Sequence, residues 1–114
     1  MLHTVVSIER VNDPLRPDWF RVWFEQHGTG QERNRFRVEL SRSDWKKLGK
    51  GLQHSSPFKV GARIYFLIEV TARQDILIEH YIEGSFWTER YLGHLDDSTR
   101  QTLQEAVQQV LATQ

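Results

Sequence analysis

The chain contains no cysteine. Disulfide bonds, thiolate metal sites and cysteine nucleophiles are therefore excluded from its chemistry. It also has no apolar run near the ~20 residues that a membrane-spanning helix requires. Its first ten residues have neither the basic start nor the small-residue cleavage site of a secretory signal. We expect a cytoplasmic protein that does not enter a membrane.

The formal net charge is zero, since 15 basic residues balance 15 acidic ones. The two halves differ, because residues 1–60 hold 11 Lys+Arg and 7 Asp+Glu whereas residues 61–114 hold 4 and 8. The basic half could attract phosphate groups, and the acidic half could equally attract the basic half of a second copy. Together with the aromatic strand faces described below, this asymmetry favours a homodimer.

Sequence motifs for catalysis are missing. The chain has no glycine-rich phosphate loop and no nucleophile elbow. The histidines lack the short spacings of metal ligands, and they are His3, His27, His54, His80 and His94. Glu79 and His80 would point to opposite faces of one strand, so they cannot converge on an ion. We therefore expect no metal, no cofactor and no enzymatic activity.

The length and composition are those of one ordinary domain. The chain has 114 residues, of which 39% are hydrophobic and 26% charged. These values predict a single domain spanning residues 1–114 with one hydrophobic core.

Residues 18–41 have the alternation of a β-hairpin with one buried face. If Gln26 pairs with Asn34, the inward pairs are Phe24 with Phe36, Val22 with Val38, and Phe20 with Leu40. The outward pairs are then Glu25 with Arg35, Trp23 with Arg37, and Arg21 with Glu39. A slip of one residue would place arginine beside the core, so this register is strongly specified.

The outward face of this hairpin is the candidate binding surface, and its residues are Trp19, Arg21, Trp23, Arg35 and Arg37. Tryptophan and arginine are enriched at protein interfaces, which predicts self-association or binding of another, unknown protein. Ring faces beside guanidinium groups are also how sheet proteins hold single-stranded nucleic acid without reading its sequence. Alternatively, ion pairs and a cation–π contact between Trp23 and Arg37 would only stabilise the hairpin.

The rest of the chain predicts further strands and two helices. We expect strands at residues 2–11, 60–71, 76–82 and 85–92, the second of these long and central. A short helix follows Ser41, which has Asp44 at capping-box spacing, and Gly49 and Gly51 should limit its length. A second helix over residues 96–111 has Ser98 and Gln101 at the same spacing.

The expected core combines the apolar faces of these elements. Its members are Phe20, Val22, Phe24, Phe36, Val38, Leu40, Trp45, Leu48, Ile64, Phe66, Ile68, Ile78, Leu103, Val107 and Val110. We predict an α+β fold in which two helices pack on a curved antiparallel sheet of about six strands. The order of elements is a pseudo-repeat, βββα-βββα, without repetition of the sequence itself.

Two parts of the chain resemble known families. The strand-strand-strand-helix order, with Val-Glu-Leu-Ser-Arg-Ser-Asp-Trp-Lys-Lys-Leu at residues 38–48 entering the first helix, resembles the architecture of Whirly, PUR and PC4-type single-strand binders. This resemblance implies nucleic-acid binding on the sheet. Residues 91–107 are similar to the closing helix of MazF/PemK ribonuclease toxins. The N-terminus lacks the Gly-Asp-Ile strand and the Gly-His-Glu-Gln-type loop of those toxins, so no catalytic residue is carried over.

Overall fold

The computed structural model describes residues 2–27, 33–62, 65–81 and 88–113. These residues form the order βββα-ββββα. The elements are β1 (Leu2–Arg10), β2 (Trp19–His27), β3 (Arg33–Ser41), α1 (Arg42–Leu52), β4 (Phe58–Gly61), β5 (Phe66–Val70), β6 (Asp75–Tyr81), β7 (Thr88–His94) and α2 (Asp97–Ala112). The α+β class is confirmed.

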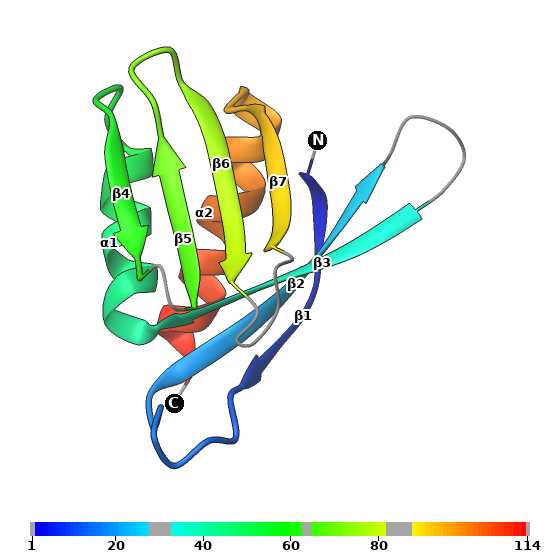
Figure 1. Cartoon of the computed structure of the whole chain (residues 1–114), viewed down its shortest axis with the longest axis vertical. Coiled ribbons are helices and arrows are strands. Elements are labelled where there is room, and N and C mark those ends of the chain that lie inside the picture. The colour runs from blue at the N-terminus through cyan, green and yellow to red at the C-terminus, as the bar shows by residue number, and fades with distance from the viewer. Residues whose placement is uncertain (1, 28–32, 63–64, 82–87, 114) are drawn as a thin grey trace.

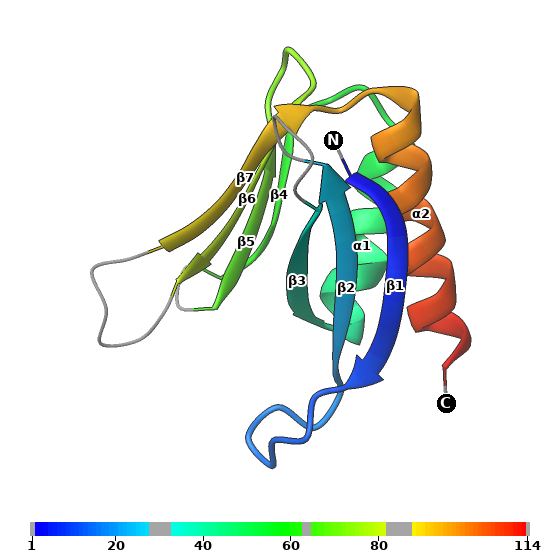
Figure 2. The same ribbon diagram turned by 90° about the vertical axis from the view of Figure 1, so that its right-hand side faces the viewer.

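The strands form two antiparallel sheets, so the expectation of one curved sheet of about six strands is wrong. β1, β2 and β3 make a three-stranded sheet, and β4 to β7 make a four-stranded one, each in chain order. Figure 1 shows α1 and α2 side by side behind the four-stranded sheet, while β2 and β3 cross its lower end obliquely. Figure 2 shows β1, β2 and β3 side by side in front of α1, with the four-stranded sheet on one side of them and α2 on the other. One buried apolar cluster joins both sheets and both helices.

The predicted long strand at residues 60–71 is instead two paired strands, β4 and β5. Gly61 has a φ of 98°, and the Ala62 N–H donates to the Phe66 carbonyl at 2.9 Å. Val60 consequently lies opposite Ile68. Both are buried on the same face, so the period of two continues across the turn and hides it from the sequence pattern.

The other strand predictions in the second half fit better. β6 matches the predicted strand as far as Tyr81, and Ile82 lies outside the described residues. β7 starts at Thr88 and continues two residues past the predicted end, to His94. The predicted residues 85–87 lie outside the described part.

The β2–β3 hairpin has the predicted register along its whole length. Gln26 pairs with Asn34, and the three apolar pairs and three outward pairs follow as expected. Among the inward side chains Phe36 is 7% exposed and the others 0%. Every predicted core residue is buried except Ile64, which lies outside the described residues.

Helix α1 begins as predicted but contains both glycines expected to end it. The Asp44 N–H donates to Ser41 Oγ at 3.1 Å, which confirms the N-cap. A Cβ at Gly49 would lie 2.8 Å from Val107 Cγ1, and one at Gly51 would lie 2.7 Å from the Phe58 ring. Gly49 is thus kept inside the helix by the close approach of α2 rather than by a turn.

Gly49→Ala should destabilise the protein although alanine is the better helix former. The intrinsic gain of about 1 kcal/mol is opposed by overpacking against Val107, which typically costs about 1–3 kcal/mol. We expect a net loss of up to about 2 kcal/mol in chemical denaturation, and recovery in the double variant Gly49→Ala with Val107→Ala relative to Val107→Ala alone. A stabilised single variant would contradict the close helix packing.

Helix α2 matches the predicted range within one residue, but its N-cap is a different residue from the one predicted. Asp96, not Ser98, is the N-cap, and its carboxylate accepts from the Thr99 N–H at 2.8 Å. The predicted core residues Leu103, Val107 and Val110 are buried, and Ala106 is buried with them. Leu111 is 40% exposed, so in the last turn of α2 Val110 belongs to the core and Leu111 does not.

The C-terminal end of each helix is bound by an arginine from the other helix. Arg42, at the start of α1, donates to the Val110 carbonyl at 3.4 Å and to the Thr113 carbonyl at 2.7 Å. Arg100, in the first turns of α2, donates to the Leu52 carbonyl at the end of α1. These reciprocal contacts satisfy terminal carbonyls and place positive charge at the negative ends of the helix dipoles.

The Asp96 cap should make stability depend on acid pH. The backbone hydrogen bond from Thr99 lowers the pKa of Asp96 below its ordinary 3.8. A lowered folded-state pKa gives stabilisation that is complete above the unfolded pKa and is lost as the pH falls through the folded value. Asp96→Ala should cost about 1 kcal/mol at pH 7, and progressively less in denaturation at acid pH values that fall through the folded-state pKa of Asp96. An equal cost at pH 7 and at acid pH would refute the charged cap, and Asp97→Ala is the matched control.

Candidate functional site

The five predicted surface residues lie together on the outward face of the three-stranded sheet. We call this surface the Arg–Trp face, formed by Glu9 on β1, Trp19, Arg21 and Trp23 on β2, and Arg35, Arg37 and Glu39 on β3. Trp19, Arg21, Trp23 and Arg37 are half-buried, and Arg35 is exposed. Strand alternation places all of them opposite the core side of the sheet.

A buried carboxylate organises this face. The Glu39 side chain is 6% exposed, and its oxygens lie 3.3 Å from Arg21 Nη2, 3.3 Å from Arg37 Nε and 3.5 Å from Arg16 Nη1. One carboxylate thus faces three guanidinium groups from two strands and a loop. The predicted Arg21–Glu39 pair is confirmed as part of this larger cluster.

Glu9 is a second carboxylate of the face, and the sequence analysis missed it. It accepts from Arg21 Nη1 at 2.9 Å and from Trp23 Nε1 at 3.4 Å. The hydrogen bond from Arg21, followed by that from Trp23, lowers the pKa of Glu9. Its place opposite Arg21 was not predicted, because two register shifts interrupt the pairing of β1 with β2 and no parity was assigned to that strand.

Arg16 and Tyr65 are further members that sequence reasoning did not find. The guanidinium of Arg16 lies 5.3 Å from the centre of the Trp19 ring and 5.2 Å from that of Tyr65. The two rings meet edge to face at 5.2 Å. Arg16 Nε also donates to Asp13 at 3.0 Å. Arg16 therefore holds the loop between β1 and β2 against Trp19 of the face and against Tyr65, which directly precedes β5.

The remaining cross-strand predictions gave two different outcomes. Arg37 lies over the Trp23 ring at 5.8 Å, which confirms the cation–π contact. Glu25 and Arg35 are opposite each other in the register, yet no ion pair joins them in the described part of the chain, and Glu25 has other contacts. Arg35 is thus the exposed cation of the face, while Arg16, Arg21 and Arg37 are held by carboxylates.

The described residues do not provide a cluster of metal ligands. No group of three or more His, Asp or Glu side chains that could hold an ion occurs among them. His80 is half-buried and stacks on Phe66, its partner across β5 and β6, with the ring centres 4.2 Å apart.

The comparisons give the chain no relatives. No protein-family model, no curated protein and no solved structure matches it. The likenesses to single-strand binders and to ribonuclease toxins therefore rest on the quoted residues alone. Neither of the two helices in the described residues is long and apolar enough to span a membrane.

Proposed function

We propose that the chain is a non-enzymatic interaction module that binds another protein through the Arg–Trp face. The observation that carries this proposal is the fixed arrangement of planar side chains around Glu39. Arg16, Arg21 and Arg37 are each held by a carboxylate, and two of them also lie over tryptophan rings. Side chains that are already ordered lose little entropy on binding, which favours protein recognition.

The charges of the face favour a protein over a nucleic acid. Glu9 and Glu39 offset Arg21 and Arg37, and Asp13 offsets Arg16. A phosphate backbone would meet carboxylates as well as guanidinium groups, and it gains affinity mainly from uncompensated positive charge. Protein interfaces accept such mixed charge, since their polar groups pair across the contact.

Capture with matched variants tests the proposal. The purified chain, Arg35→Glu and Lys46→Glu would be immobilised and exposed to nuclease-treated cell extract. Arg35 and Lys46 are both exposed, and Lys46 lies on α1, away from the face. We expect a protein retained by the wild type and by Lys46→Glu but lost from Arg35→Glu, and then bound directly once purified. Equal retention by the wild type and both variants would place the binding surface elsewhere.

A homodimer is the simplest form of this proposal. The outward residues of the face would then contact a second copy, assisted by the opposite charges of the two halves of the chain. Light scattering at tens of micromolar should give the mass of a dimer that dissociates on dilution. A monomer mass at every concentration would leave a different protein as the partner.

Single-stranded nucleic acid is the second candidate ligand, and one observation favours it. Arg35 is exposed and has no ion pair in the described part of the chain, so it is available to a phosphate group. Stacking of bases on Trp19 or Trp23 would have to displace Arg16 or Arg37 from the rings. The two candidates therefore differ in whether these cation–π contacts persist in the complex.

A further inference from the structure

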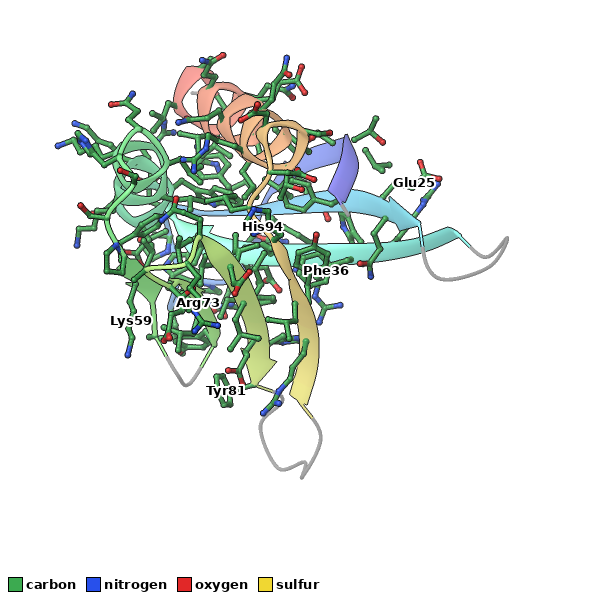
Figure 3. The ribbon with its side chains drawn as sticks, turned by 90° about the horizontal axis from the view of Figure 1, so that it is seen from above. Glu25, Phe36, Lys59, Arg73, Tyr81 and His94 are labelled. Atoms are coloured by element: carbon green, nitrogen blue, oxygen red, sulfur yellow. The ribbon has the colours of Figure 1, made fainter. Side chains whose placement is uncertain are left out.

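We infer that the free edge of β3 binds an extended acidic segment of a partner protein as an additional antiparallel strand. This inference rests on the proposed function and specifies the kind of partner. β3 is the last strand of the three-stranded sheet. Figure 3 shows the β2–β3 arm passing Phe36 and extending beyond the four-stranded sheet on the side of Glu25. In this half of β3 Arg35 is exposed, whereas Phe36 on the inner face is buried and packs on Tyr91 of β7 with the ring centres 5.7 Å apart.

The hydrogen-bond pattern shows which main-chain groups of β3 face outward. The Arg42 N–H donates to the Asp18 carbonyl at 2.8 Å, and the Val11 N–H donates to the Trp19 carbonyl at 2.9 Å. Alternate residues of a strand bond to opposite neighbours, so even residues of β2 pair with even residues of β3. The N–H and C=O groups of Arg35 and Arg37 therefore point to the free edge. Within the described residues, the N–H and C=O groups of Arg35 and Arg37 have no main-chain hydrogen-bond partner.

The side chains at this edge define the chemistry of the partner. Arg35 and Arg37 lie on one face, and Phe36 lies between them on the other. A strand opposite them would place acidic residues beside the arginines and an apolar residue beside Phe36. An extended segment that alternates acidic and apolar residues fits both faces, and recognition by strand addition gains affinity from main-chain bonds and specificity from such side chains.

A second copy of β3 is a poor occupant of the same edge. A two-fold axis at Phe36 would place Arg35 opposite Arg37, and an axis at Arg37 would place that residue opposite itself. Like charges directly opposite each other are destabilising, and charged edges are a known defence against self-pairing. The other edge of this sheet, β1, is interrupted by two register shifts, which disrupt a ladder. The regular edge of β3, where Arg35 is exposed and has no ion pair among the described residues, therefore suits a partner of opposite charge.

Synthetic peptides test this inference on the intact chain. The probe is the blocked peptide Val-Glu-Val-Glu-Val, whose glutamates would lie opposite Arg37 and Arg35. Its binding should slow amide exchange at Arg35 and Arg37 by about tenfold or more at saturation, as expected for newly formed ladder bonds. The peptide Val-Lys-Val-Lys-Val should give no protection. Protection by both peptides would contradict recognition by charge.

Backbone methylation provides the matched control. Residues directly opposite in a hydrogen-bonded antiparallel pair carry their side chains on the same face, so the glutamate N–H groups of the peptide would bond to β3. Methylating these nitrogens should abolish binding, whereas methylating the central valine nitrogen should leave it unchanged. Equal effects of the two methylations would overturn strand addition.

The peptide experiment and the capture experiment separate this inference from the proposed function, because the first measures binding at the β3 edge and the second measures retention of a protein partner. Arg35→Glu should lower the affinity for the acidic peptide about tenfold, because one ion pair is lost and one repulsion is gained. The same variant should allow binding of the lysine peptide. Unchanged amide exchange of the wild-type chain with the acidic peptide at millimolar concentration would overturn the edge inference. A partner captured by the Arg–Trp face would still stand in that case, and failure of the capture experiment alone would leave the edge as a separate surface.

Discussion

Replacing Glu39 by alanine should lower the free energy of unfolding by about 2–4 kcal/mol. Removing one member of a buried ion pair usually costs about 3–5 kcal/mol, because the remaining charge loses its partner without regaining water. The side chains of Arg16, Arg21 and Arg37 are 19%, 29% and 35% exposed, so they keep part of their hydration and the expected cost is smaller. Equilibrium denaturation with urea measures the change.

Salt and a second carboxylate variant make this expectation specific. Three neighbouring guanidinium groups repel one another once Glu39 is gone, so added salt should restore part of the stability of Glu39→Ala. Glu9→Ala removes the more exposed carboxylate of the same face and should cost much less than Glu39→Ala, because solvent screens its ion pair with Arg21. A loss below 1 kcal/mol for Glu39→Ala, unaffected by salt, would contradict the role of Glu39 as the centre of the face.

Trp45→Ala should be at least as destabilising, with a loss of about 3–5 kcal/mol typical of a large aromatic residue removed from a core. Trp45 is fully buried on α1, and its Nε1–H donates to the Phe20 carbonyl of β2 at 3.1 Å. This one side chain therefore joins the first helix to the strand that carries Trp19, Arg21 and Trp23. The variant should unfold at a lower temperature and at a lower denaturant concentration.

Trp45→Phe separates packing from the hydrogen bond. Phenylalanine retains most of the apolar volume but leaves the buried Phe20 carbonyl without this donor, which costs about 1–3 kcal/mol. The phenylalanine variant should therefore lie between the wild type and Trp45→Ala. If both variants were as stable as the wild type, the packing of α1 on the three-stranded sheet would be contradicted.

The hairpin and its outward face were predictable because both depend on local alternation. Once the even-numbered residues of the hairpin are assigned to the buried face, the buried pairs, the Trp23–Arg37 contact and the Arg21–Glu39 pair all follow. The core followed from the same reasoning. Alternation also survives a tight turn that returns the chain to the same face, and for this reason the turn after Gly61 and the division into two sheets were missed.

The contacts that complete the face are long-range, and periodicity carries no information about them. Arg16 comes from a loop, Glu9 from a strand with an irregular register, and Tyr65 from the residue directly before β5. Gly49 shows that a correct local preference can also mislead. Glycine favours the end of a helix, but here it lies inside α1 because Val107 of α2 approaches closely. Its place inside α1 required knowledge of how the two helices pack.

Titration of the chain with a single-stranded oligonucleotide at low salt, followed by tryptophan fluorescence, tests the central claim most directly. Arg16 and Arg37 lie over Trp19 and Trp23, and Glu9 and Glu39 offset the positive charge beside them. We therefore expect no quenching, in the wild type or in Trp23→Phe. Quenching that is lost in Trp23→Phe and falls steeply with added salt would show bases stacked on the face and phosphates paired with its arginines, and would contradict a protein-binding role for the Arg–Trp face.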